Sequence, residues 1–541
     1  MRLNGFRLVK MSLPRVSLPV VFLNVLALFL SACGGGSSNG MGGSGGGSGT
    51  IPPSTANEWT WMRGADADLP VPPGSSGPWS EPYNSDPYYG TLGASGAHTT
   101  PGGRNSSAYW TDKNGNFWLF GGDGLDGSPE PIEGLLNDLW EFSPATNQWT
   151  WMGGSSTLSH VCAYAYCGLP GIYGVQGAPS PSNLPGGREV AVTWTDSAGN
   201  FWLFGGQGTD SVGVQGYLND LWEFNPTTGE WVWMSGSSTV GTNPQGQEGS
   251  YGTQGVAAPG NVPPGLIEAA SWIDKNDNLW LFGGQGVTSV GGMGYDFNNL
   301  WEFSPATKEW TWISGSGGGE NPDYGVYGTQ GIPAASNIPS GRHGATAWTD
   351  SSGKFWLFGG FGTYPANQSW VGSNFQNDLW EFDPTTGQWT WMSGTAGGVP
   401  NSFGAPAPPP GSYGALGVAS SSNVPGGRGG ASGWADSSGN LWLFSGTGSD
   451  SLGTYGDLND LWEFSPAKKQ WIWMSGNATA WPGGVYGVEG TAAGANTPGG
   501  RYDSASWMDR NGNFWLFAGW GNITEVNGGS TALNDLWRYQ P

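Results

Sequence analysis

Five arginines with a common spacing are the charged residues that could most readily act together. Each lies six residues before a tryptophan: Arg104, Arg188, Arg342, Arg428 and Arg501. A guanidinium can hold an anionic group through two parallel hydrogen bonds, so arginines gathered at one place could form an anion-binding site. The alternative is that each arginine pairs with a carboxylate or a loop carbonyl of the fold. Leu266 stands at the same position in a sixth stretch of sequence.

The residues that directly follow this position differ in their chemistry. They include Glu189, Glu268, His343, Tyr502 and Asp503. Carboxylates near arginines could catalyse proton transfer on a sugar, although such carboxylates also form structural ion pairs. The sequence contains no nucleophile–base motif, no glycine-rich phosphate loop and no zinc-ligand spacing, so we predict no cofactor and no metal.

Four of the 34 tryptophans fall outside the regular spacing that the others follow. They are Trp79, Trp370, Trp481 and Trp520. Exposed aromatic rings can stack on sugars or anchor a protein partner, which makes these residues candidates for binding. The alternative is that they pack inside long loops.

One repeated block positions all of these residues, and it occurs six times. Each copy contains the arginine position, a tryptophan, FWLFGG, NDLWEF and WTWM, or close variants of them. The sixth copy stops at Pro541 without its last segment, and a spare copy of that segment is found at Trp59–Met62. Six four-stranded units, the last one completed from the N-terminus, predict an all-β fold: a six-bladed β-propeller closed by an N-terminal strand.

Two links between these segments vary in length, and both are expected on one face of the ring. They join FGG to NDLW, and WTWM to the next copy. Variable loops on a fixed scaffold are where ligands usually bind. Within the second link a tyrosine always lies fifteen residues before the arginine position, which makes it part of the framework. These tyrosines are Tyr89, Tyr173, Tyr251, Tyr327, Tyr413 and Tyr486.

The N-terminus has the features of a targeting segment. Four basic residues precede an apolar run at 18–30, which ends in Leu-Ser-Ala-Cys at 30–33. This pattern resembles a bacterial lipoprotein signal, in which Cys33 would carry the lipid. We therefore expect a signal peptide at 1–32, a lipidated cysteine and Gly/Ser tether at 33–56, and the propeller at 57–541. The resemblance implies a lipid-anchored protein of the bacterial envelope, and Gly34 favours the outer membrane.

The charge and the remaining cysteines narrow the possible partners. The formal net charge is −23, and loss of residues 1–32 makes it more negative, so nucleic acid is not an expected partner and the only predicted membrane contact is the lipid anchor.

Cys162 and Cys167 are close enough in sequence to form a disulfide in an oxidising compartment, or they remain free thiols. The DGLDG sequence at 123–127 could bind calcium through oxygen atoms or form a simple turn.

The glycine doublets after the aromatic strand, followed by NDLW and a late tryptophan, resemble the kelch motif. The doublets are Gly121–Gly122, Gly205–Gly206, Gly283–Gly284 and Gly359–Gly360, whereas Ser445–Gly446 and Ala518–Gly519 depart from the pattern. The resemblance extends over about residues 57–541 and includes the central domain of galactose oxidase. It implies a kelch-type propeller, but kelch propellers include enzymes and binding modules alike.

Two enzyme classes of this family can be compared with the chain. Copper radical oxidases need two histidines and two tyrosines, one of them linked to a cysteine, whereas the three histidines here, His98, His160 and His343, lie in different segments. Sialic acid mutarotase-like enzymes use carboxylates and arginines at the channel mouth. Our main prediction is a non-catalytic module that binds a glycan or a protein through the variable face. The alternative is a sugar-active enzyme, sialic acid mutarotase-like rather than a copper oxidase, with its site at the channel mouth.

Overall fold

The computed structural model describes residues 56–64, 86–129, 131–158, 167–241, 246–288, 294–317, 323–363, 373–396, 399–400, 406–522 and 530–541. All of them belong to one compact unit, Ile51–Pro541. Cys33, Trp79, Cys162 and Trp370 lie outside the described residues, as does the side chain of Cys167, so the predicted lipidation and disulfide stay predictions. Among the described residues there is no helix that is long and apolar enough to cross a membrane.

Each copy of the repeat lies in one sheet with four antiparallel strands, which we call a blade, and in the first copy this sheet also includes the short strands β2 (Arg104–Asn105) and β7 (Cys167–Gly168). The first three blades are β3 (Ala108–Thr111), β4 (Phe117–Leu125), β5 (Glu133–Ser143), β6 (Gln148–Gly153); β9 (Val192–Thr195), β10 (Phe201–Phe204), β13 (Leu221–Asn225), β14 (Glu230–Ser235); and β16 (Ala270–Ile273), β17 (Leu279–Phe282), β20 (Leu300–Ser304), β21 (Glu309–Ser314). The next two are β23 (Thr346–Thr349), β24 (Phe355–Phe358), β27 (Leu379–Asp383), β28 (Gln388–Ser393); and β32 (Ser432–Ala435), β33 (Leu441–Phe444), β36 (Leu461–Ser465), β37 (Gln470–Ser475).

The last blade is completed from the other end of the chain. It consists of β39 (Ala505–Met508), β40 (Phe514–Phe517), β43 (Leu536–Gln540) and β1 (Glu58–Arg63). In this sheet Trp59 pairs with Tyr539, and Trp61 pairs with Trp537. The predicted closure by the N-terminal strand is therefore confirmed.

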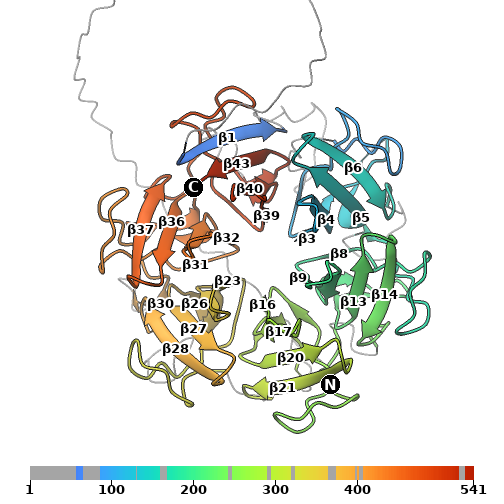
Figure 1. The fold of residues 1–541 in the computed structure, drawn as a ribbon, viewed down its shortest axis with the longest axis horizontal. Coiled ribbons are helices and arrows are strands. Elements are labelled where there is room, and N and C mark those ends of the chain that lie inside the picture. Colours follow the sequence, from blue (N-terminus) through green and yellow to red (C-terminus); the bar gives the residue numbers. More distant parts are fainter. Residues whose placement is uncertain are drawn as a thin grey trace, which may run out of the picture. The chain divides into compact units, whose positions relative to one another are not determined.

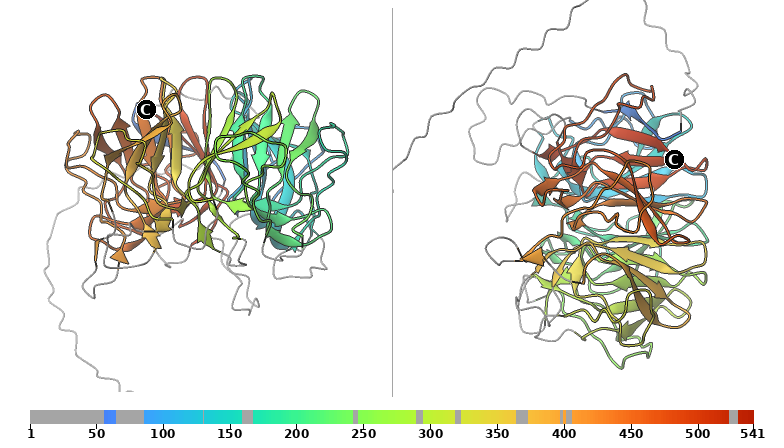
Figure 2. Two further views of the ribbon diagram at one scale, coloured as in Figure 1. Left: turned by 90° about the horizontal axis from the view of Figure 1, so that it is seen from below. Right: turned by 90° about the vertical axis from the view of Figure 1, so that its left-hand side faces the viewer.

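The blades surround a central axis, as Figure 1 shows, and Figure 2 shows them from the side. The innermost strands β3, β9, β16, β23, β32 and β39 each contact the next one, and β39 contacts β3. These repeated antiparallel sheets confirm the all-β propeller predicted from the repeat.

Aromatic side chains fill the spaces between neighbouring blades. Trp507 of the last blade stacks on Phe117 of the first, with ring centroids 5.1 Å apart and planes at 6°. The same stack recurs between Trp110 and Phe201 and between Trp272 and Phe355. The indole NH groups of Trp110 and Trp272 also donate to backbone carbonyls of the next blade. Trp110 and Trp272 therefore join one blade to the next through both packing and a hydrogen bond, whereas Trp507 does so through packing.

Short strands extend each blade beyond its glycine doublet. In the first blade β2 (Arg104–Asn105) pairs with the end of β4. In the others, short three-stranded sheets are formed by β8 (Arg188–Glu189), β11 (Gln207–Thr209), β12 (Gln215–Tyr217); β15 (Leu266–Ile267), β18 (Gln285–Gly286), β19 (Tyr295–Asp296); β22 (Arg342–His343), β25 (Phe361–Thr363), β26 (Ser373–Phe375); β31 (Arg428–Gly429), β34 (Thr447–Ser449), β35 (Tyr455–Asp457); and β38 (Arg501–Tyr502), β41 (Trp520–Gly521), β42 (Thr531–Ala532). The remaining short strands are β7 (Cys167–Gly168), β29 (Val399–Pro400) and β30 (Pro406–Ala407).

The doublet itself separates the two parts of the blade. Gly121 and Gly122 have φ values of 62° and 95°, a region that side chains rarely adopt. Ser445 and Ala518, which replace the first glycine in two blades, take the same conformation with φ of 66° and 61°. The break lets the strand after the doublet pair with the arginine strand, so the two variable links meet at one end of the blade, as predicted.

Candidate functional site

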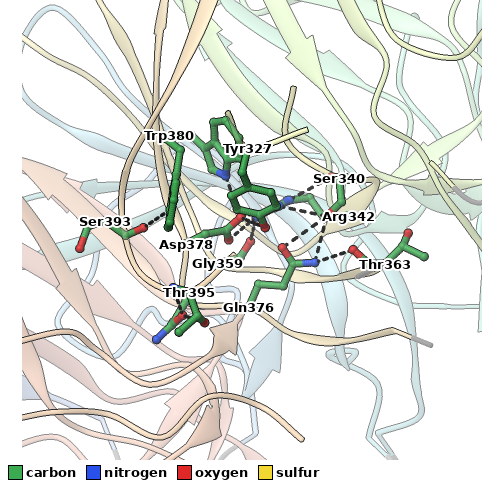
Figure 3. A network of polar contacts seen from close by, with 12 residues as sticks. Tyr327, Ser340, Arg342, Gly359, Thr363, Gln376, Asp378, Trp380, Ser393 and Thr395 are labelled. Atoms are coloured by element: carbon green, nitrogen blue, oxygen red, sulfur yellow. Dashed lines mark hydrogen bonds and ion pairs between the residues drawn. The ribbon is translucent and has the colours of Figure 1, made fainter. Parts of the chain in front are cut away.

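The five arginines lie inside the blades instead of lining an open site. Arg342 donates two hydrogen bonds to Asp378, at 2.7 and 2.9 Å, and its remaining donors bond to the carbonyls of Ser340 and Gly359 and to the hydroxyl oxygen of Ser340 (Figure 3). Tyr327 and Trp380 donate to the same carboxylate. The other four arginines repeat the pairing, with side chains no more than 1% exposed: Arg104 with Asp138, Arg188 with Asp220, Arg428 with Asp460 and Arg501 with Asp535.

This arrangement corrects the predicted anion site. Each guanidinium is bonded to an aspartate and to backbone carbonyls and is at most 1% exposed, so it is not open to a ligand. The alternative, framework pairing with a carboxylate and loop carbonyls, is what the structure shows. The six spaced tyrosines are framework residues, as predicted, and five of them donate to the paired aspartate.

The third blade replaces both members of the pair. Leu266 stands in place of the arginine and is buried, and Asn299 stands in place of the aspartate. Asn299 donates to the hydroxyl oxygen of Tyr251 at 2.8 Å. A neutral amide is the appropriate partner here because a carboxylate without the arginine would be a buried, unpaired charge.

A closed ring of backbone hydrogen bonds surrounds the axis two residues after the arginine position. The six residues with positive φ there are Ser106, Val190, Glu268, Gly344, Gly430 and Asp503. The NH of each donates to the carbonyl of the one before it, at 2.9–3.1 Å, and Ser106 closes the ring on Asp503. The backbone is therefore the same in every blade, while the side chains that it presents at the axis differ.

A cavity of about 370 Å³ gathers several of the predicted site residues. Glu268, His343, Tyr502 and Asp503 all line it. Its walls also include Phe361, Phe375, Tyr455 and Gln285. We call this cavity the axial pocket. Glu268 and Asp503 also line a smaller cavity of about 170 Å³.

His343 is held in place by a carboxylate. Its Nδ1 lies 2.7 Å from Oδ1 of Asp296, a residue of β19 in the neighbouring blade. Burial lowers the pKa of His343, but the hydrogen bond to Asp296 and the charges of Glu268 and Asp503 outweigh it, so the pKa is raised. The imidazole is therefore fixed in orientation and favours its protonated form.

Glu268 and Asp503 are two carboxyl groups in one desolvated place. Burial raises the pKa of Asp503 to about 8, with a further contribution from the charge of Glu268. Burial also raises the pKa of Glu268, against the opposing influence of His343. The carboxyl oxygens lie over glycines, since a Cβ on Gly344 would be 2.8 Å from Oε2 of Glu268 and one on Gly430 2.5 Å from Oδ1 of Asp503.

Glu189 does not line the axial pocket and belongs to a second acidic group. Burial raises its pKa to about 8, and the charges of Asp123, Asp503, Glu268 and Glu133 add to this shift. Burial beside Glu133 likewise raises the pKa of Asp123 to about 7. Among the described residues, no group of three or more His, Cys, Asp or Glu side chains is placed to hold a metal ion.

The two described candidate tryptophans lie near the pocket. Trp481 is 42% exposed, and its indole donates to the carbonyl of Tyr455 at 3.1 Å. Trp520 pairs with Tyr502 across β38 and β41. Neither lines the axial pocket.

Sequence reasoning missed Asp296, Phe361, Phe375 and Tyr455. The segments that contain these residues were expected to be variable loops. In the structure these segments form short strands near the axis. One signal could have found Phe361: the residue directly after each glycine doublet faces the residue after each arginine, as in the pair His343 and Phe361.

Comparison with known proteins gives a partial match. No protein-family model matches the chain. The chain is 29% identical to the N-acetylneuraminate epimerase of Escherichia coli strain K12 and to that of Shigella flexneri, over 155 residues in each case. The N-acetylneuraminate epimerase of Escherichia coli O139:H28 is 29% identical over 161 residues. The match covers 27% of this chain and 39% of each relative's length, and it supports a likeness to kelch-type propellers.

Proposed function

We propose that the protein binds a reducing sugar in the axial pocket and catalyses the exchange of its anomers by proton transfer at the anomeric hydroxyl and the ring oxygen, an activity of the mutarotase type. The observation that carries the proposal is the placement of a histidine–aspartate pair and two carboxyl groups of raised pKa around one cavity with aromatic walls. Relatives named N-acetylneuraminate epimerase support a sugar as the class of substrate.

The chemistry needs one acid and one base on the same sugar. In ring opening, a base takes the proton of the anomeric hydroxyl, the bond from the anomeric carbon to the ring oxygen breaks, and an acid protonates that oxygen. Ring closure on the other face of the carbonyl reverses these transfers and yields the other anomer. Groups with pKa values near neutrality suit both steps.

The surroundings of His343 and Glu268 indicate which residue is the acid and which is the base. His343, held by Asp296 and favouring its protonated form, acts as the acid toward the ring oxygen. Glu268, whose carboxyl group lines the pocket, acts as the base. Phe361 and Phe375, whose ring centroids are 5.2 Å apart, provide an apolar surface for the sugar ring.

The test measures how fast a purified anomer reaches equilibrium, by polarimetry, with the full chain and a panel of reducing sugars. We expect acceleration by the unaltered protein and a loss of about a hundredfold or more in His343→Asn and Glu268→Gln. The asparagine retains an amide donor for Asp296. Glu302→Gln, the same change on β20 of the third blade but outside the pocket, should leave the rate unchanged. A panel that shows no acceleration, or full activity in both pocket variants, contradicts the proposal.

A second candidate function is non-catalytic binding of a glycan or a protein through the variable face. It is favoured by the exposed aromatic pair Tyr455 and Trp481, which are 53% and 42% exposed and joined by a hydrogen bond. A glycan array probed with the full chain and with Trp481→Ala tests it. Binding that is lost in the variant, without any anomer exchange, would favour this function. In either case we propose a lipid anchor at Cys33 and a location in the bacterial envelope.

A further inference from the structure

We infer that the axial pocket takes an amino sugar whose free ammonium group lies beside the anomeric carbon, with Asp503 as the partner of the ammonium. The inference rests on the proposed function for the position of the sugar, and it names the class of substrate. It differs from the acidic sugar in the names of the matched relatives.

The first argument is the sign of the charge in the pocket. None of the described residues that line it is lysine or arginine, and its one basic residue, His343, is already bound to Asp296. Glu268 and Asp503 face the cavity, with Asp296 behind the imidazole and Asp457 nearby. A sugar acid would add a further carboxylate to this group of carboxyl groups, which would oppose the ionisation of Glu268 and Asp503, whereas a cation would favour it.

The second argument is that the nearby arginines cannot bind the carboxylate of a sugar acid. Arg501 directly precedes Tyr502, and its guanidinium donates hydrogen bonds to Asp535 and to two backbone carbonyls. Arg342 beside His343 is bound in the same way. Releasing either to bind an anion would leave a buried aspartate unpaired, which is strongly unfavourable.

The third argument concerns the partners of the two carboxyl groups. Asp503 has one side-chain contact, with the hydroxyl of Ser106 at 3.3 Å, and no side-chain hydrogen bond of Glu268 is described. Carboxyl groups in a desolvated place are stabilised by a cation or by several donors. An ammonium supplies three donors and a positive charge, whereas a sugar hydroxyl supplies one donor.

The fourth argument is the shape and the lining of the site. A pyranose with its amine next to the anomeric carbon presents two adjacent polar groups, and the pocket presents two adjacent carboxyl groups, Glu268 and Asp503. Phe375 and Tyr455, with centroids 5.8 Å apart and planes at 27°, form an aromatic wall. Aromatic faces attract both the apolar face of a sugar and a nearby cation.

The experiment is calorimetric titration of the full chain at neutral pH with glucosamine, N-acetylglucosamine and N-acetylneuraminate. The first two differ only in the acetyl group that removes the charge. We expect glucosamine to bind about tenfold tighter or more than N-acetylglucosamine. This ratio of affinities corresponds to the net contribution of one charge-assisted hydrogen bond. Because Asp503 must ionise to pair with the ammonium, binding should also release a proton, seen by repeating the titration in buffers of different ionisation enthalpy.

Asp503→Asn and Glu302→Gln are the matched variants. Asp503→Asn should lose the preference for the amine, and Glu302→Gln should keep it. If the unaltered protein binds N-acetylglucosamine or N-acetylneuraminate as tightly as glucosamine, or more tightly, that result alone overturns the inference. A glucosamine dimer added as a fourth ligand separates a free monosaccharide from the end of a de-N-acetylated glycan, and preference for either amine-bearing ligand supports the inference.

The two proposals can fail separately. Selective glucosamine binding without faster anomer exchange would support the substrate class and contradict the catalytic role. Faster anomer exchange of N-acetylneuraminate but not of glucosamine would contradict the substrate class and leave the catalytic role in place.

Discussion

Asp378 accepts hydrogen bonds from Arg342, Tyr327 and Trp380 at once, and all of these groups are buried. Such a network stabilises a fold only when every member has its partners. The third blade obeys the same rule by a paired replacement, since Leu266 and Asn299 remove the positive and the negative charge together. At the scale of residues, the framework is therefore selected for charge neutrality inside each blade.

Asn299→Asp should destabilise the protein by about 3 kcal/mol, because the new carboxylate has no arginine to pair with. Adding Leu266→Arg should recover part of this loss, so the two changes should be non-additive in urea unfolding. Asn276→Asp, an exposed change in the same blade, should have little effect. Additive losses in the double variant would contradict the account of the pair.

The acidic group around Glu189 should make stability depend on pH. Burial raises the pKa of Glu189 to about 8, so the folded protein binds more protons than the unfolded chain between about pH 4 and that value. The free energy of unfolding should therefore fall as pH rises across this window. Glu189→Gln should flatten the fall and be more stable than the unaltered protein at the alkaline end.

Urea unfolding at a series of pH values measures this dependence. Glu248→Gln, an exposed change in the same molecule, serves as the control and should reproduce the unaltered profile. If Glu189→Gln also reproduced it, the carboxyl would not be held in the protonated form as described.

At the scale of elements, β1 closes the ring, because it supplies the outer strand of the last blade. Trp59 on β1 is 2% exposed and packs against Phe444 of the preceding blade, with ring centroids 4.9 Å apart. Without β1, the edge of β43 would be open and could pair with other chains.

Trp59→Ala should therefore destabilise the protein by about 3–5 kcal/mol and increase its tendency to aggregate. Thermal unfolding followed by light scattering measures both effects. Leu452→Ala, at a side chain that is 79% exposed, is the control and should change neither. An unchanged midpoint for Trp59→Ala would mean that β1 is not needed to close the ring.

Some strands could be predicted from the sequence and others could not. The four strands of each blade, their turns and the closure by Trp59–Met62 followed from fixed spacing, because packing between blades tolerates no change of length there. The strands that carry Phe361 and Asp296 could not be predicted, since their links vary in length and their pairing depends on the backbone break at the glycine doublet. The sequence left open whether the arginines bind an anion or pair within the framework, because Asp378 lies 36 residues from Arg342 and only the fold brings them together.

At the scale of the molecule, a nearly uniform ring carries a site that is not uniform. The hydrogen-bonded ring from Ser106 to Asp503 repeats one backbone conformation six times, and the third and last blades place Glu268 and Asp503 there. Function is therefore expected where the copies differ, at the axis, and not in the framework that they share. The net charge of −23 adds a long-range attraction for cations.

The most direct test of this account is the pH dependence of anomer exchange at the axial pocket, measured with the unaltered protein and with Asp296→Asn. The account predicts a rate that falls at both ends of the pH range. It also predicts that the alkaline limb moves to lower pH in Asp296→Asn, because loss of the carboxylate lowers the pKa of His343. No acceleration by the unaltered protein, or an alkaline limb that stays in place in the variant, would contradict it.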